Sequence, residues 1–186
     1  MTTDEKIKAL IDTDFLSHIA DIKKVDPIQT FKHYCSAAQL DVCMHERVYE
    51  EEAKTFPTTT PFFEHKAIEI LRFIDALNED ERTLYKMYVT HLYSSFKKEP
   101  YPCGGDVFQG WQRKCSLGEV HSIAVCIMFA YSIFLSDDKD SKKIHTIAKE
   151  NFKGKNSKVL NRKEAIDAIT EFSNLTRSER RAISHS

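Results

Sequence analysis

Residues 8–19 read KALIDTDFLSHI, in which the apolar run Ala9–Ile11 stops at two aspartates, Asp12 and Asp14. A short apolar run of this kind indicates a buried strand. The apolar residues after it recur at helical spacing, and Asp14 can cap the helix that they predict. The carboxyl end of a parallel strand is where an open α/β sheet places its site. The segment therefore predicts the first strand of such a sheet and a position for functional carboxylates.

Three further acidic clusters stand where a predicted strand ends or a predicted helix begins. They are Glu50 with Glu51, Glu119, and Asp137 with Asp138 and Asp140. Ionised carboxylates gathered at one edge of a sheet repel one another and need cations, and their hard oxygen atoms suit Mg²⁺ or Mn²⁺. A two-metal site of that kind can activate water and cut a phosphodiester bond.

Each acidic cluster also has an ordinary structural explanation. Asp12 and Asp14 can cap the following helix, and residues 50–52 can form one solvated helix face. Glu119 can simply favour the positive end of its helix, and residues 137–140 can form a turn. The coincidence of all four clusters at one predicted sheet edge favours the metal site.

Strands and helices alternate along the chain, which predicts an α/β fold with a mostly parallel sheet between helical layers. The predicted strands are Lys8–Asp12, Leu40–Met44, Ile133–Ser136 and Lys158–Leu160. After the first helix, the predicted helices are Pro27–Ala38, His45–Lys54, Phe62–Leu77, Asn78–Lys98, Glu119–Tyr131, Lys139–Asn151 and Arg162–Asn174.

The length of 186 residues fits one domain, which we assign to residues 1–175. Residues 55–117 form a helical and loop segment inserted mid-chain, with a long loop at Glu99–Leu117. We expect this segment to shape the choice of substrate or partner and to supply no metal ligand. Residues 176–186 form a polar tail that we expect to fray.

The cysteine pattern predicts a reducing, cytoplasmic compartment. The five cysteines are odd in number and show no CxxC spacing, and the chain shows neither an N-terminal leader nor an apolar run of transmembrane length. The eight histidines form no HExxH motif and no cluster with cysteine, which argues against a zinc site.

The formal net charge of −1 excludes a polycation, so binding of a nucleic acid would depend on a local basic stripe. Solvated helix faces are the ordinary alternative for such residues. Lys142 and Lys143 are the best phosphate-binding candidates, because they directly follow an acidic cluster. Trp111 either stacks on a base or anchors its own loop. The other candidate members of the stripe are Lys23, Lys24, Lys97, Lys98, Arg113, Lys114, Lys153, Lys155 and Lys158.

At four places, in order, the chain resembles the PIN-domain nucleases. IDTDFL (11–16) is similar to their opening hydrophobic-Asp-Thr/Ser-x-x-Leu motif, and VYEEEA (48–53) to their Val-x-x-Glu helix start. LGEVHSIAVC (117–126) resembles the Gly-Glu-x-x-x-Ile-Ala motif, and IFLSDDKDSK (133–142) the strand-ending Thr/Ser-x-Asp-Lys/Arg-Asp motif.

The resemblance implies a set of metal ligands, position by position. The implied ligands are Asp12, Glu51, Glu119 and Asp138, with Asp140 as an auxiliary acid. If the motif is aligned one residue earlier, Glu50 takes the place of Glu51. It also implies that the hydroxyls of Thr13 and Ser136 orient the site or its water.

The family fold is a three-layer α/β/α sandwich, and the implied activity is Mg²⁺- or Mn²⁺-dependent endonuclease action, usually on RNA. Many small members are toxins held in check by an antitoxin, so an antitoxin joins RNA as an expected partner. For the extra helices we expect one of three roles: recognition of the substrate, formation of a homodimer interface, or binding of a partner protein. The alternative is a non-catalytic PIN-like module that binds RNA or a protein. Phosphotransfer signalling fits less well, because no mid-chain strand ends in Asp.

Overall fold

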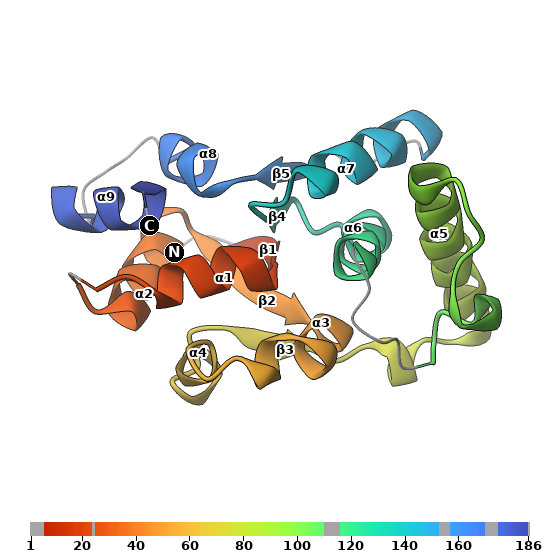
Figure 1. Ribbon diagram of the computed structural model, residues 1–186, viewed down its shortest axis with the longest axis horizontal. Helices are drawn as coiled ribbons and strands as arrows, with labels where there is room; N and C mark the ends of the chain where they lie inside the picture. The colour runs from red at the N-terminus through yellow and green to blue at the C-terminus, as the bar shows by residue number, and fades with distance from the viewer. Residues whose placement is uncertain (1–5, 24, 110–115, 153–156, 170–174, 186) are drawn as a thin grey trace, which may run out of the picture.

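The computed structural model describes residues 6–23, 25–109, 116–152, 157–169 and 175–185 (Figure 1). The fold is α/β, as the sequence predicts. Five strands form one parallel sheet in the order β3-β2-β1-β4-β5. The strands are β1 (Ile7–Ile11), β2 (Leu40–His45), β3 (Glu69–Leu71), β4 (Ile133–Leu135) and β5 (Lys158–Leu160).

Two groups of helices cover the two faces of the sheet, which completes the three-layer sandwich. Helix α1 contacts α2 and α9, whereas α5, α6 and α7 contact one another. Right-handed crossovers place these two groups on opposite faces. The helices are α1 (Thr13–Ala20), α2 (Pro27–Ala37), α3 (Glu46–Glu51), α4 (Thr60–Glu64), α5 (Glu79–Lys97), α6 (Leu117–Phe129), α7 (Lys139–Asn151), α8 (Arg162–Asp167) and α9 (Arg177–His185). Three short 3₁₀ turns are η1 (Ala53–Thr55), η2 (Ile74–Ala76) and η3 (Cys103–Gly105).

Across the described ranges, none of the helices combines the length and the apolar character needed to cross a membrane.

The strand order reverses direction at β1. From β1 the chain builds β2 and β3 on one side and later β4 and β5 on the other, so the topological switch point lies between β1 and β4. Pairing continues just past both strands, because the Asp12 amide donates to the Leu135 carbonyl (2.9 Å) and the Ser136 amide to the Leu160 carbonyl (3.1 Å). Asp12 and Ser136 are thereby fixed at the same edge of the sheet.

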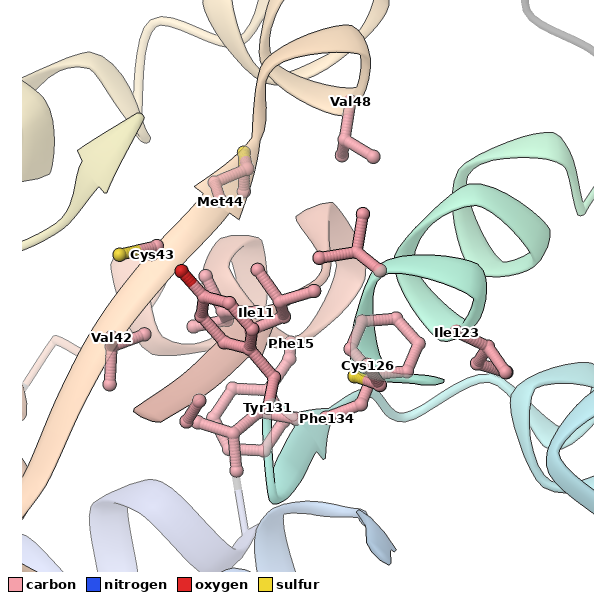
Figure 2. Close-up of a cluster of buried hydrophobic side chains, with 14 of the residues drawn as sticks. Ile11, Phe15, Val42, Cys43, Met44, Val48, Ile123, Cys126, Tyr131 and Phe134 are labelled. Carbon is pink, nitrogen blue, oxygen red and sulfur yellow. The ribbon is translucent and has the colours of Figure 1, made fainter. Parts of the chain in front are cut away.

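The buried core joins the central strands to α1, α3 and α6 (Figure 2). Ile11 of β1, Met44 of β2 and Phe134 of β4 are almost fully buried, and so are Phe15 of α1 and Ile123 of α6. Apolar burial of these side chains is the main force that fixes the carboxyl edge of the sheet.

The predicted helix Phe62–Leu77 is wrong. Helix α4 ends at Glu64, Lys66 adopts a positive φ of 49°, and strand β3 follows. The apolar spacing of this segment imitates a helix, but β3 pairs with the free edge of β2, with Leu71 opposite His45. Hydrogen bonding to an existing strand has overridden the local periodicity.

The second predicted helix of the inserted segment is confirmed as α5. Asn78 and Glu81 form a reciprocal capping box, with both hydrogen bonds between 2.9 and 3.0 Å. Tyr85, Val89 and Leu92 of α5 are completely buried. Residues 55–117 therefore supply both an edge strand and part of the core, so the segment is integrated into the domain.

The C-terminal tail, which we expected to fray, forms helix α9. Ile183 is completely buried, and Glu179 accepts hydrogen bonds from the amide and hydroxyl of Thr176 (both 2.8 Å). Glu179 also bonds to His33 of α2 at 2.7 Å. One apolar anchor and one capped turn are enough to dock this short polar segment.

A buried chain of hydrogen bonds ties the inserted segment to β2 and α6. Burial lowers the pKa of His45 well below its usual value and that of His121 to about 3, so both rings are neutral. The Arg47 amide donates to His45 Nδ1 (3.0 Å), which leaves the proton of His45 on Nε2, facing the Tyr85 hydroxyl (2.9 Å). Tyr85 then donates to His121 Nδ1 (2.6 Å), and His121 Nε2 donates to the Tyr101 hydroxyl (2.8 Å).

We expect Tyr85→Phe to lower the free energy of unfolding by at least about 2 kcal/mol, since it leaves a buried donor on His45 and a buried acceptor on His121 unsatisfied. Urea denaturation measures the effect. Tyr88→Phe, on a half-buried residue of the same helix, is the matched control and should change stability by less than about 0.5 kcal/mol. Equal losses in the two variants would contradict the role of the chain.

Candidate functional site

Asp12 is the N-cap of helix α1, directly after β1. Its Oδ1 accepts the Thr13 amide (2.6 Å) and its Oδ2 accepts the Ser136 hydroxyl (2.9 Å), and the residue is only 6% exposed. The capping role that we assigned to Asp14 thus belongs to Asp12. Asp14 instead lies in the first turn, where its carbonyl accepts the Ser17 hydroxyl.

Ser136 orients the carboxylate of Asp12. Its only proton goes to Asp12 Oδ2, so its oxygen accepts from the Ser141 hydroxyl (2.7 Å) and from the Asp138 amide (3.2 Å). Every hydrogen-bonding position of the hydroxyl is used. Ser136 therefore links the ends of β1 and β4 through side chains as well as through the backbone.

Glu119 lies in the first turn of α6 and is 9% exposed. Burial, together with the charge of Asp12 and the charge and hydrogen bond of Asp138, raises its pKa to about 9. Burial likewise raises the pKa of Asp12 to about 7, helped by the charges of Asp14 and Glu52 and opposed by the bond from Ser136. Three carboxyl groups from three separate elements, Asp12, Glu119 and Asp138, are thus brought within mutual influence.

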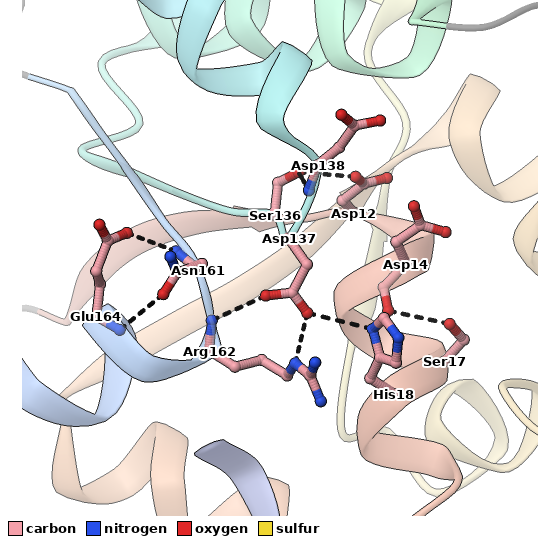
Figure 3. A network of polar contacts seen from close by, with 10 residues as sticks. All are labelled: Asp12, Asp14, Ser17, His18, Ser136, Asp137, Asp138, Asn161, Arg162 and Glu164. Atoms are coloured by element: carbon pink, nitrogen blue, oxygen red, sulfur yellow. Dashed lines mark hydrogen bonds and ion pairs between the residues drawn. The ribbon is translucent and has the colours of Figure 1, made fainter. Parts of the chain in front are cut away.

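Asp138 and Asp137 point in opposite directions at the start of α7 (Figure 3). Asp138 lies on the side of Asp12 and caps α7, with its Oδ1 accepting the Asp140 amide at 2.7 Å. Asp137 turns away to an ion pair with Arg162 (2.5 Å) and to His18 at 3.2 Å. Asp137 therefore holds α1, α7 and α8 together, and Asp138 remains with the site.

The three glutamates at the end of α3 have different surroundings. Glu50 forms ion pairs with Lys54 (2.5 Å) and Arg72 (3.5 Å), which lower its pKa. The charge of Glu51 acts on Lys54, whereas Glu52 is the member whose charge acts on Asp12. Glu51 as a ligand stays a prediction. Glu52 becomes a further candidate, which the Val-x-x-Glu spacing did not reveal.

Asp140 and the predicted phosphate-binding lysines are engaged in ion pairs. Lys143 bonds to Asp140 (2.8 Å) and Lys142 to Glu164 (2.5 Å). The Lys143 bond is the main cause of a lowered pKa at Asp140. Several residues considered above lie outside the described part of the chain: Lys24, Trp111, Arg113, Lys114, Lys153 and Lys155.

The donor chemistry of the site suits a hard divalent cation, although the side chains do not form a closed set of ligands. Among the described residues, no three His, Cys, Asp or Glu side chains converge as a metal-binding group. The neighbouring groups nevertheless offer only oxygen atoms. The Thr13 hydroxyl is buried and makes no hydrogen bond within the described ranges, so it is a further oxygen next to Asp12. A cation would favour the ionised carboxylates of Asp12 and Glu119, whose pKa values are raised mainly by burial and further by repulsion from neighbouring carboxyls.

No match was found. Comparisons with the models of protein families, with curated proteins and with solved structures all returned nothing similar to this chain. The case for function therefore depends on the residues and their geometry.

We expect the metal-free protein to lose stability as the pH rises from about 5 to about 9. Both raised pKa values mean that the folded state holds protons that the unfolded chain has released, and stability falls wherever the folded state binds more protons. Glu119→Gln should flatten this dependence and raise the melting temperature at high pH in a chelating buffer.

Glu150→Gln, on the exposed face of α7, is the control and should keep the wild-type pH dependence. Thermal melts at several pH values measure the effect. If the melting temperature of Glu119→Gln depends on pH in the same way as that of the wild type, the Glu119 carboxyl is not the source of the pH dependence.

Proposed function

We propose that this chain is a metal-dependent endoribonuclease of the PIN type. The observation that carries the proposal is the burial of Asp12 and Glu119 at the switch point of a parallel sheet, where the charges of Asp12 and Asp138 act on Glu119 and the pKa values of Asp12 and Glu119 are raised. Carboxyls crowded in this way are costly to a fold, and such cost is common at functional sites. The order and spacing of the four sequence motifs support the same activity.

The residues of the site have separate roles in this proposal. Asp12, Glu119 and Asp138 would hold Mg²⁺ or Mn²⁺, with Glu51 or Glu52 as the acid from α3. When bound, such an ion supplies a Lewis acid for the phosphate and lowers the pKa of water. Ser136 keeps the Asp12 carboxylate in one orientation by donating to Oδ2. The three hydrogen bonds of Ser136 make that orientation a fixed property of the fold.

Binding of a cation would displace the proton that Glu119 carries in the metal-free protein. The pKa of about 9 means that this carboxyl is protonated at neutral pH and bonds to Asp138. Ligation needs the carboxylate, so metal binding should release a proton. Glu119 is therefore the residue at which pH and metal concentration compete.

The proposed substrate is RNA, and a protein antitoxin and a second copy of the chain are further proposed partners. A cytoplasmic location follows from the expected reducing environment. The three cysteines whose side chains are described, Cys35, Cys43 and Cys126, are free.

The second candidate is a non-catalytic module of the same fold that binds RNA or protein. The observation in its favour is that the described carboxylates do not converge as a ready set of metal ligands. Calorimetric titration with Mn²⁺ separates the two candidates. A nuclease should bind the ion with a carboxylate-dependent heat, whereas the module should show none.

We expect Asp12→Asn to reduce Mn²⁺-dependent RNA cleavage by at least about a hundredfold, because it removes a charged ligand. The fold should be kept, because Asn caps a helix as well as Asp does. Asp26→Asn is the control, since Asp26 also caps a helix, α2, through its Oδ1 but lies outside the candidate site. Cleavage is measured on a labelled oligoribonucleotide, and circular dichroism confirms the fold. Cleavage that persists in excess chelator, or an active Asp12→Asn protein, would refute the mechanism.

A further inference from the structure

The C-terminal end of α5 is brought to the start of α7. The two helices contact each other, and at one end of this contact the ring of Tyr88 lies 4.7 Å from that of Phe152, just past the end of α7. Lys97 lies at the last turn of α5, and its charge acts on Asp140 in the first turn of α7. The helices therefore run antiparallel, and the last turn of α5, which carries Lys97, lies near the first turn of α7.

Asp140 differs from the other acids of this region. Its Oδ1 bonds to Lys143 (2.8 Å) and its Oδ2 accepts the Ser116 hydroxyl (3.3 Å). Asp12 and Glu119 are buried against other carboxyls, whereas Asp140 is surrounded by cations and a hydroxyl. The surroundings of Asp140 therefore suit a residue that positions a cationic side chain. The position of Asp140 in its motif did not predict this role.

We propose that Lys143, which is paired with Asp140, and Lys97, in the last turn of the neighbouring helix α5, form a phosphate-binding rim for the backbone of single-stranded RNA, and that Asp140 positions Lys143 and does not ligate metal. The inference rests on the proposed function, because it assigns the substrate contacts of the same site. Asp140 stands two residues after Asp138, and Ser116 stands three residues before Glu119. The rim therefore borders the carboxyls from two elements.

The charges at this rim favour an anion that approaches from solvent. Lys97 and Lys143 supply two positive charges beside Asp140, and the positive end of the α7 macrodipole adds to them, whereas the charge of Asp138 also acts on Lys143. The side chain of Lys143 is 65% exposed, so its ammonium can reach a phosphate while it still pairs with Asp140. Phosphates of a nucleic acid backbone suit such point charges.

The rim is tested by the binding of a short, labelled single-stranded RNA in metal-free buffer across a salt series, followed by fluorescence anisotropy. Lys97→Ala and Lys143→Ala should each weaken binding and lower the log–log salt slope by about 0.7 per lost contact. Lys86→Ala on the exposed face of α5 and Lys149→Ala on that of α7 are matched controls and should keep the wild-type slope. Unchanged slopes in both rim variants, or no RNA binding by the wild type, would overturn the inference.

The role of Asp140 is tested separately by calorimetry with Mn²⁺. Asp140→Asn should leave the Mn²⁺ affinity unchanged, whereas Asp138→Asn should abolish it. Loss of Mn²⁺ binding in Asp140→Asn would make this residue a ligand and refute its positioning role. If RNA binding depends on Lys97 and Lys143 but no metal-dependent cleavage is found, the proposed nuclease function is refuted and the phosphate-binding rim is supported. If RNA cleavage is unchanged in both lysine variants, the phosphate-binding role of the rim is refuted and the nuclease proposal is kept. If the variants instead weaken binding of a protein partner, the rim is a protein-binding surface.

Discussion

The pairing of β1 with β4 is the constraint on which the rest of the site depends. Because β1 has neighbours on both sides, it cannot shift along the sheet without breaking two ladders. This fixed register brings Asp12 to Ser136, and the hydroxyl then holds the carboxylate in place. Glu119 and Asp138 are added by helices that begin at this same edge. The acidic group is therefore a consequence of strand order and not of local sequence alone.

The burial of these carboxyls lowers the stability of the fold electrostatically, and burial of the apolar core offsets this loss. Burying Asp12 and Glu119 near other carboxyls forces protons onto groups that would be ionised in water. The core beneath them, with Ile11, Phe15 and Phe134 almost fully buried, supplies the compensating burial. Proteins that keep such a cost generally do so for function.

The sequence predicted those parts of the fold whose signals are local. The apolar runs of β1, β4 and β5, the proline start of α2 and the capping box of α5 all have local causes, and these elements are found within a few residues of their predicted bounds. Strand β3 was missed because the apolar spacing of its segment is that of a helix, and only its pairing with β2 makes these residues a strand. The docking of α9 was missed because the tail carries few apolar residues, and its contacts, such as the bond of Glu179 to His33, are with residues distant in the chain.

The candidate site was predictable in part for the same reason. Asp12, Glu119 and Asp138 follow strand ends and helix starts that a linear pattern reveals. The approach of Glu52 to Asp12 and the ion pair of Asp140 with Lys143 depend on side-chain directions, which spacing does not fix. The buried chain through Tyr85 was hidden among aromatics at helical spacing, because its partners His45 and His121 come from β2 and α6.

The two outer strands of the sheet have a consequence for how this protein can be recognised. β3 and β5 are each three residues long, so each edge offers only a few backbone groups to another chain. Short edges are one way in which proteins avoid sheet-to-sheet aggregation, and they are poor templates for an added strand. Any macromolecule that binds this protein would therefore gain its affinity from side chains on helices and loops rather than by extending the sheet.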